Sequence, residues 1–168
     1  MKERGEIVGS GDIASALKER DGLIFFASGV SNSAEMRESE YQREKDLLLR
    51  QDRSKRLVYF GSLSIFYGDT RYTQHKREME QLVKDNFPKY CIVRLGNIAW
   101  GNNPHTLINA LRNRVANQEP VEIRDVYRYV VEQDEFLHWI NLIPDFNCEM
   151  NVTGQPMKVA EIFKKYVI

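Results

Sequence analysis

Short apolar runs alternate with charged stretches of helical length from residue 6 to residue 95 of the chain. The runs at 23–27 and 57–60 are continuous in apolar residues, which is typical of strands that are buried on both faces of a sheet. The charged stretches at 34–50 and 71–85 have the length of crossover helices. This alternation predicts an α/β fold, in which helices cover a parallel sheet.

The length of 168 residues predicts a single domain, because a chain of this size buries roughly 70% of its unfolded surface and builds a full core. The strands expected in the sheet are 6–9, 23–27, 57–60 and 90–95, and the helices are 12–19, 34–50 and 71–85. The less regular part from 101 to 168 is expected to contain helices near 104–115, 134–143 and 159–166, a mixed segment at 121–131 and a strand at 147–152. This part is expected to be a small α+β lobe at the C-terminal edge of the sheet.

The charges are balanced, with 24 Lys and Arg against 24 Asp and Glu. Balanced charge argues against a nucleic-acid partner, because nonspecific binding of nucleic acid depends on a basic surface. No run of 18 apolar residues is present, so we expect a cytoplasmic protein without a membrane partner. Cys91 and Cys148 are expected to be small core residues. His105 and His138 have no cysteine or carboxylate at ligand spacing, so we predict no metal site.

The segment GSGDIA at 9–14 has the G-x-G-x-x-A spacing, directly after an expected strand and at the start of an expected helix. In this context, glycines let the backbone approach a pyrophosphate at the helix N-terminus. The candidate phosphate-binding residues are Gly9, Ser10, Gly11, Asp12 and Ile13. A tight turn without any ligand explains the same residues. The charge of Asp12 would oppose phosphate binding if the side chain points inward, whereas next to the helix start Asp12 can instead cap the helix. Residues 30–33 contain no carboxylate for an adenosine ribose.

Tyr72 and Lys76 are four residues apart in the expected helix 71–85, so their side chains share one face. A lysine ammonium beside a phenol favours the phenolate, which makes a tyrosine a usable proton donor and acceptor for carbonyl chemistry. Tyr41 and Lys45 have the same spacing, but Tyr41 is expected to be a surface residue because no serine-bearing strand precedes it. His75 is expected to be exposed on another face of the helix.

Tyr72 follows an expected strand that ends in Gly61-Ser62-Leu63-Ser64. The strand would place hydroxyls at the C-terminal edge of the sheet, where doubly wound folds bind ligands. Because side chains alternate along a strand, Ser62 and Ser64 are expected on one face, opposite Leu63.

The order and spacing of these segments resemble the extended short-chain dehydrogenase/reductases, the NAD-dependent epimerase/dehydratase group that acts on nucleotide sugars. The resembling segments are 9–14, FASGV at 26–30, VYFGSLS at 58–64, Tyr72 with Lys76, RLGNI at 94–98, GNNP at 101–104, RYVV at 128–131 and NVTG at 151–154. Together they extend over nearly the whole chain. The stretch FASGVSNS at 26–33 is similar to small members that belong to polysaccharide synthesis.

The resemblance implies a shortened Rossmann-like domain, with a dinucleotide-binding core at 1–100 and a small substrate lobe at 101–168. It implies NAD or NADP as the cofactor, a nucleotide sugar as the substrate, and a homodimer built from the helices 34–50 and 71–85. By resemblance, Tyr72 is the acid/base, Lys76 holds the nicotinamide ribose, and a serine polarises the substrate carbonyl, for which we choose Ser62. The other implied contacts are Ala27, Ser28 and Gly29 with the cofactor, and Ser64 and Asn97 with the substrate.

The chain also departs from the family pattern. Leu63 stands where the family usually has serine or threonine, so Ser62 or Ser64 must substitute for it. The second and third strands of the full-length fold, which form much of the adenosine pocket, have no counterpart between 16 and 21. Asn97 is equally typical of a turn that follows a strand. These departures leave a second hypothesis open, a non-catalytic relative that keeps the fold as a binding or scaffold module.

Overall fold

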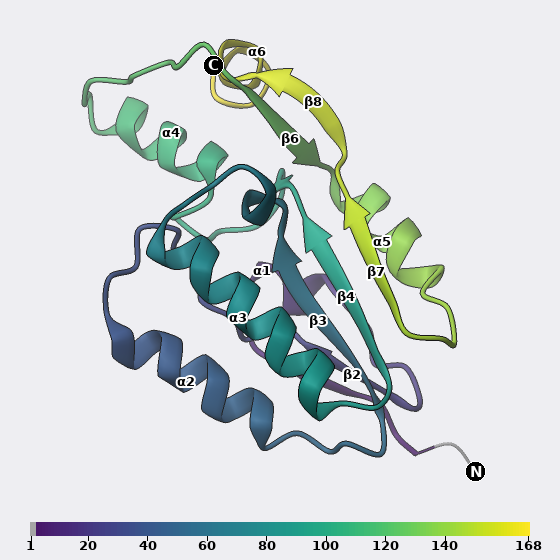
Figure 1. Ribbon diagram of the computed structural model, residues 1–168. Helices are drawn as coiled ribbons and strands as arrows, with labels where there is room; N and C mark the ends of the chain where they lie inside the picture. The colour runs from purple at the N-terminus through teal and green to yellow at the C-terminus, as the bar shows by residue number, and fades with distance from the viewer. Residues whose placement is uncertain (1–2) are drawn as a thin grey trace.

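The main sheet contains five parallel strands in the computed structural model, which describes residues 3–168 (Figure 1). The strands are β1 (Glu6–Val8), β2 (Leu23–Phe26), β3 (Arg56–Ser62), β4 (Tyr90–Leu95) and β7 (Cys148–Val152). They lie in the order β1-β2-β3-β4-β7. Because all five are parallel, their C-terminal ends meet at one edge of the sheet.

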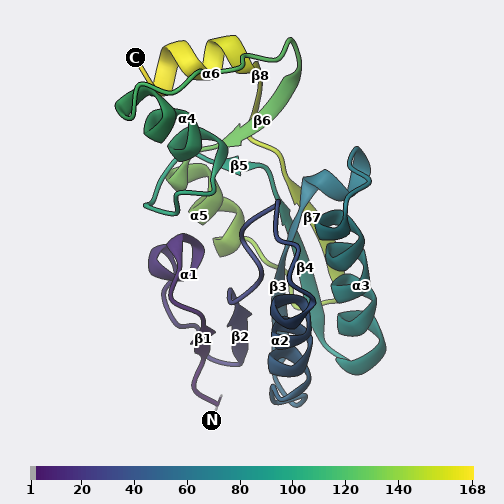
Figure 2. The same ribbon diagram turned by 90° about the vertical axis from the view of Figure 1, so that its left-hand side faces the viewer.

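Each face of the main sheet is covered by its own helices, because side chains alternate along a strand. On β2, Phe25 belongs to one apolar cluster, and Ile24 and Phe26 belong to the other. The Phe25 cluster includes residues of α1 (Asp12–Ala16) and α5 (Gln133–Asn141). The Ile24 cluster includes residues of α2 (Glu38–Leu49) and α3 (Arg71–Asn86), which lie side by side (Figure 2). No helix within residues 3–168 is long and apolar enough to cross a bilayer.

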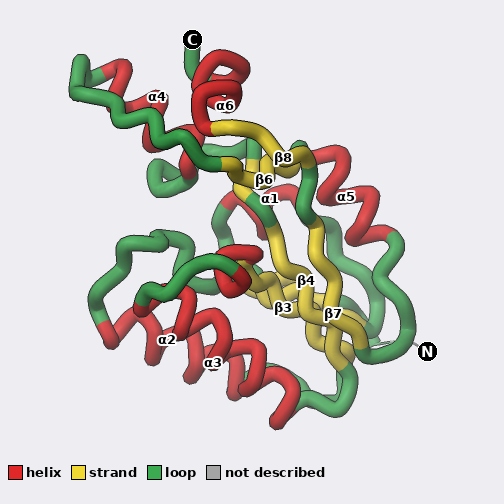
Figure 3. The backbone as a smooth tube through the Cα atoms, turned by 45° about the horizontal axis from the view of Figure 1, so that its top comes forward, coloured by secondary structure: helices red, strands yellow, loops and turns green. Residues whose placement is uncertain are grey.

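A second sheet of three strands lies beyond the C-terminal edge of the main sheet (Figure 3). Its strands are β5 (Asn97–Ile98), β6 (Tyr127–Val131) and β8 (Gln155–Lys158), in the order β5-β6-β8. The helices α4 (Leu107–Ala116) and α6 (Val159–Tyr166) pack on it through Ile108, Val130 and Ile162. Between β6 and β8 the chain returns to the main sheet as β7, so this part is connected to the core twice.

The predicted fold class is confirmed: a Rossmann-like parallel sheet with flanking helices carries a smaller α+β part. Helix α2 begins at Glu38 and not at 34, because side chains bind the backbone in the preceding turns. Ala34 N donates to Asn32 Oδ1 at 3.0 Å, and Arg37 N donates to Glu35 Oε1 at 3.0 Å. Helix α1 ends at Ala16 and not at 19, since the next residue is extended and enters the core. The strands β5 and β8 are absent from the prediction, because β5 has two residues and β8, with the sequence QPMK, contains a proline and no continuous apolar run.

Two predictions of surface position are wrong, those for Tyr41 and His75. Tyr41 is 1% exposed and donates its hydroxyl to Glu35 O at 2.5 Å. His75 is 0% exposed, and its ring centroid lies 4.4 Å from that of Tyr41. Both side chains lie where α2 packs against α3, so two helices that are rich in charge still bury a polar seam between them.

The packing of α5 on the sheet predicts a large loss of stability for Phe136→Ala. Phe136 is fully buried, with ring centroids 5.9 Å from Phe60 and 5.2 Å from Trp100. Removing its ring leaves a cavity, and we expect the free energy of unfolding in urea to fall by about 3–5 kcal/mol. Trp139→Ala is the control on the same helix, because its ring is 40% exposed. Similar small losses for both variants would contradict this packing.

Candidate functional site

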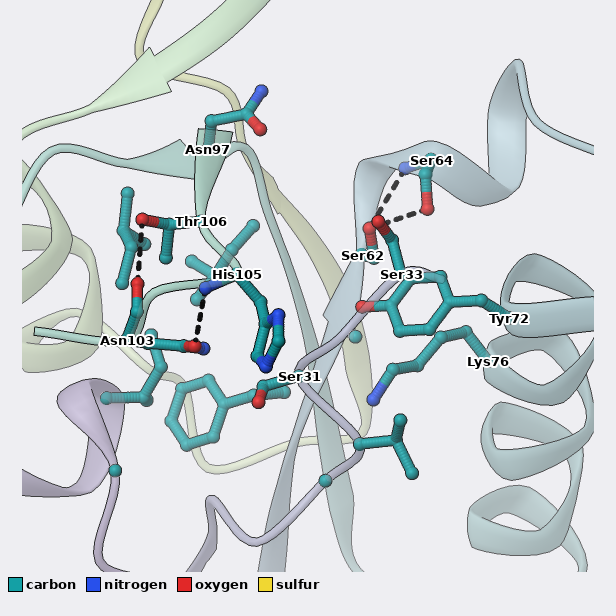
Figure 4. Close-up of a pocket in the computed structure, with 18 of the residues that line it drawn as sticks. Ser31, Ser33, Ser62, Ser64, Tyr72, Lys76, Asn97, Asn103, His105 and Thr106 are labelled. Atoms are coloured by element: carbon teal, nitrogen blue, oxygen red, sulfur yellow. Dashed lines mark hydrogen bonds between the residues drawn. The ribbon is translucent and has the colours of Figure 1, made fainter. Parts of the chain in front are cut away.

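A cavity of about 1170 Å³ opens at the C-terminal edge of the main sheet, next to the second sheet. Its walls are the segments that follow β1, β2, β3 and β4, the start of α3, and the loop before α4. Open parallel sheets bind ligands at this edge. The cavity is therefore the candidate site, and Figure 4 shows side chains that line it.

Tyr72 and Lys76 lie together in this cavity. Helix α3 starts with a capping box, in which Thr70 and Thr73 each bind the backbone N–H of the other. This start places Tyr72 in the first turn and Lys76 one turn later. The Lys76 Nζ atom is 5.5 Å from the centroid of the Tyr72 ring, and both side chains point into the cavity (Figure 4). The structure thus brings the predicted pair together.

Ser62 at the end of β3 and Ser64 in the 3₁₀ helix Leu63–Phe66 that follows both lie on the cavity side, so the expected strand alternation stops at Ser62 (Figure 4). Ser62 Oγ lies 2.7 Å from Ser64 Oγ and accepts a hydrogen bond from Ser64 N at 3.1 Å. Leu63 is buried in the core. Hydroxyls therefore lie on both neighbours of Leu63 and face the cavity, where Ser62 or Ser64 is predicted to stand in for the family's hydroxyl.

The carboxylate of Glu44 on α2 is the centre of a buried polar network that the sequence analysis missed. Glu44 is 0% exposed. Its Oε1 atom accepts from Val30 N at 2.6 Å and lies 3.4 Å from Lys76 Nζ and 3.2 Å from His75 Nε2. Its Oε2 atom accepts from the Tyr59 hydroxyl at 2.8 Å. One carboxylate therefore connects α2 with α3, β3 and the loop after β2.

The network fixes the charges of its members. Burial opposes ionisation of Glu44, but the Lys76 ammonium and polar contacts outweigh it and lower the pKa of Glu44 to about 2. Burial also opposes the charge of Lys76, and the Glu44 carboxylate outweighs it and raises the pKa of Lys76. Burial and the same carboxylate raise the pKa of Tyr59 well above its ordinary value. Neither ring nitrogen of His75 has a partner in hydrogen-bond geometry among residues 3–168, although Nε2 lies 3.2 Å from Glu44 Oε1.

The turn after β1 is part of the cavity wall. Gly9 has a φ of +125°, and a Cβ there would lie 2.3 Å from Ala27 O, so glycine is needed for the close approach of two strand ends. Ser10, Gly11 and Ile13 line the cavity, and a Cβ on Gly11 would meet open space. The predicted turn therefore has free space for a ligand at Gly11, whereas at Gly9 it packs directly against the backbone at the end of β2.

The carboxylate of Asp12 is turned to the loop before α4. It accepts hydrogen bonds from Asn102 N at 2.9 Å and from Asn103 N at 2.8 Å. A Cβ on Gly101 would lie 2.1 Å from the carboxyl carbon of Asp12, so the loop packs tightly on it. Asp12 does not cap α1. Its carboxylate instead fixes a cavity wall, and the expected repulsion of phosphate is reduced because its charge is bound to backbone amides.

The loop after β2 brings Ala27, Ser28 and Gly29 to the cavity, where a cofactor contact is predicted for them. A Cβ on Gly29 would lie 2.8 Å from Lys76 Nζ, so a side chain there would displace the ammonium. Arg43, which the sequence analysis did not single out, also lines the cavity and donates from Nη1 to Ser28 O at 3.2 Å.

The second sheet and its loops contribute the opposite wall. Asn97 lines the cavity, and its Nδ2 atom donates to Tyr129 O at 3.1 Å, so its amide also joins β5 to β6. The sequence analysis missed further lining residues in this part, which are Asn103, His105, Thr106, Arg124 and Arg128. Four of the described lining residues are lysine or arginine, and the one carboxylate among them is Asp12. This excess of positive charge favours an anionic ligand.

The described residues fit one half of a dinucleotide better than the other. Lys76, Gly29 and the open turn at Gly11 line the cavity and offer donors and space. On the other side of the turn, β1 is the edge strand, and the chain passes from α1 to β2 through residues 17–22 alone. The predicted absence of two strands is confirmed, and no strand beyond β1 forms an adenosine wall within residues 3–168.

Comparisons with solved structures identify similar folds, whereas no protein-family profile and no curated protein sequence matches the chain. WbmG of Bordetella bronchiseptica, in complex with NAD and UDP, matches 86% of the chain with a TM-score of 0.68 at 14% identity. The dTDP-4-dehydrorhamnose reductase of Bacillus anthracis, in complex with NADP, matches 86% with a TM-score of 0.66 at 16% identity. The capsular polysaccharide assembling protein CapF of Staphylococcus aureus matches 85% with a TM-score of 0.55 at 16% identity.

The chain spans 54%, 62% and 43% of the lengths of these three structures. At such identities the matches establish the fold, and the expectation of a shortened Rossmann-like chain is confirmed. The chain has a shortened form of the fold that is shared by NAD-dependent epimerases, dehydratases and reductases of the short-chain dehydrogenase/reductase superfamily, the group that its sequence resembles.

Proposed function

We propose that the protein is an NAD(P)-dependent enzyme of the oxidoreductase, epimerase or dehydratase type that acts on a nucleotide sugar in the synthesis of a surface polysaccharide. One observation carries this proposal: Tyr72, Lys76 and Ser62 share a cavity at the C-terminal edge of the sheet. A phenol, an ammonium and a hydroxyl in one place are the groups that interconversion of an alcohol and a carbonyl requires.

Tyr72 moves the proton in this mechanism. As the phenolate, its oxygen takes the proton of the substrate alcohol during oxidation, and as the phenol it gives a proton to the carbonyl oxygen during reduction. Ser62 Oγ is held by Ser64, and with Ser64 Oγ as the donor of their hydrogen bond, the Ser62 proton is free for the substrate oxygen. The buried Lys76 ammonium supplies positive charge beside the phenol ring.

NAD or NADP, when bound, supplies the acceptor and donor of the hydride. The residues that would hold it are Lys76, the segment Ala27-Ser28-Gly29 and the turn from Gly9 to Ile13. Gly11 leaves open space for a close approach of a pyrophosphate, and Arg43 adds a positive charge next to Ser28.

The nucleotide-sugar class rests on charge and on the ligands of similar structures. Arg124 and Arg128 line the cavity from the second-sheet side, where a diphosphate finds two guanidinium groups. WbmG was solved with UDP, and the Bacillus anthracis reductase is named for a dTDP sugar. The name of CapF supports a role in polysaccharide synthesis. Ser64 and Asn97 are the proposed sugar contacts.

A homodimer through α2 and α3 is part of the proposal. Ion pairs between the two helices join Lys45 to Glu78 at 2.7 Å and Arg71 to Glu38 at 2.7 Å. Because these charges are paired within one chain, this face can meet its twofold copy without leaving them unpaired.

The proposed role of Tyr72 predicts that Tyr72→Phe lowers turnover of UDP-sugars with NAD by roughly 10²- to 10⁴-fold, because only the proton carrier is lost. The unfolding midpoint should stay unchanged. Tyr127→Phe is the matched control, since Tyr127 is 62% exposed on β6. Tyr41→Phe is unsuitable as a control, because it removes a buried hydrogen bond. Equal losses for Tyr72→Phe and Tyr127→Phe would exclude the assignment.

The missing adenosine wall predicts weak cofactor binding that depends mainly on the nicotinamide half. A loss of about 2–3 kcal/mol moves a micromolar dissociation constant to about 0.1 mM. Calorimetric titration with NADH and with ADP, which lacks the whole nicotinamide half, compares the two parts, and ADP should bind still more weakly. Nanomolar affinity that depends on the adenine ring would show that another pocket replaces the lost strands.

The dimer proposal predicts twice the mass of one chain in light scattering at about 50 µM. Reversing one cross-helix charge with Lys45→Glu should weaken the assembly, because the exposed face then carries unpaired carboxylates. A monomeric mass for the unmodified protein at this concentration would refute the dimer.

A further inference from the structure

Two parts of the cavity wall are held by the same oxygen atom, Glu44 Oε1. This atom accepts a hydrogen bond from Val30 N at 2.6 Å and another from Lys76 Nζ at 3.4 Å. Between these two donors lies Gly29, where a Cβ would come within 2.8 Å of Lys76 Nζ and 3.1 Å of Glu44 Oε1. The lysine, the loop after β2 and the carboxylate are therefore packed in direct contact.

The Lys76 ammonium has donors to spare in this arrangement. It carries three N–H donors, and its hydrogen-bond acceptor among residues 3–168 is Glu44. The side chain is 3% exposed, yet it lines the cavity, and Figure 4 shows Nζ pointing into it. Two N–H donors of Lys76 are thus left for a ligand. The hydrogen bond to Glu44, on the side away from the cavity, orients them.

We propose that Glu44 is a positioning residue, which holds the Lys76 ammonium and the Gly29-Val30 segment as one unit that faces the ligand. The proposed function already gives Lys76 the nicotinamide ribose as its ligand, and the inference adds that Glu44 positions the lysine for it. This inference rests on the proposed function, because it assigns the ribose of a dinucleotide to that unit. Glu44 itself stays behind the wall and touches no ligand.

A second buried carboxylate of the same chain provides the comparison. Glu80 on α3 is 5% exposed and is paired with Arg94, whose Nη2 atom lies 2.6 Å from Glu80 Oε1. It resembles Glu44 in burial and in having a cationic partner. Neither Glu80 nor Arg94 lines the cavity within the described part of the chain. A purely structural role would make the two carboxylates equivalent, whereas a positioning role sets Glu44 apart.

The charge that Glu44 provides has no substitute nearby. The titratable groups that face Lys76 and Glu44 are Tyr41 from α2, Tyr72 and His75 from α3, and Tyr59 from β3. None of these four groups is a carboxylate, so Glu44 is the counter-charge of Lys76 within residues 3–168. In Glu44→Gln the ammonium is left buried without a counter-charge, and burial then lowers the pKa of Lys76. The lysine should lose its proton at a pH where the unmodified protein keeps it.

The first measurement needs no ligand. The ¹³Cε resonance of Lys76, assigned with Lys76→Arg, is followed by NMR against pH in the full chain. We expect the protonated form to persist up to and above about pH 10 in the unmodified protein and in Glu80→Gln, and to be lost at lower pH in Glu44→Gln. If Glu44→Gln does not fold, Glu44→Asp replaces it, with a smaller shift in the same direction because the shorter carboxylate contacts Lys76 less closely. An unchanged titration overturns the proposal.

The second measurement is the dissociation constant of NADH between about pH 7 and pH 9. It should stay constant in the unmodified protein and in Glu80→Gln, and rise about tenfold with pH in Glu44→Gln, the equivalent of one charged hydrogen bond. NADH binding with the same pH dependence in all three proteins overturns the positioning role. A shifted Lys76 titration without NADH binding by any of them upholds the Glu44–Lys76 coupling and refutes the proposed function.

Discussion

The buried carboxylate of Glu44 is the contact on which the form of the cavity depends. Its two oxygens bind groups from α3, from β3 and from the loop after β2, so four segments distant in sequence meet at one charge. Removing one partner of such a buried pair leaves an uncompensated charge and costs about 3–5 kcal/mol. The two buried charges therefore stabilise each other: Lys76 stays charged because of Glu44, and Glu44 stays ionised because of Lys76.

The shortened sheet determines which parts of a ligand the chain can hold. Strand β1 is the edge, so the wall that a further strand would provide is absent within residues 3–168. The walls on the other side remain, and the loop before α4 is fixed to α1 through Asp12. Arginines from the second sheet complete this side. In the proposed function, a dinucleotide is therefore recognised mainly by its reacting half, at Tyr72 and Lys76.

The sequence predicts the parts of this structure that depend on local patterns. Continuous apolar runs identify the buried strands β2, β3 and β4, and helical spacing identifies Tyr72 with Lys76. The contact of Asp12 with residues 102 and 103 is outside the reach of such patterns, because it joins positions far apart in the chain. Strand β5 has only two residues, and β8 contains Pro156 and no apolar run, so neither shows a strand pattern.

The buried seam between α2 and α3 shows a different kind of failure. Tyr41, Glu44 and Leu48 repeat at the spacing of one helical face, and all three are buried. This repeat is visible in the sequence, but the many charges of the helix conceal it.

A structure of the protein with NADH and UDP tests the account most directly. We predict the nicotinamide ribose on Lys76 and the phosphates of UDP beside Arg124 and Arg128, whereas a dinucleotide bound away from Lys76, or an empty cavity at millimolar ligand, would contradict the account.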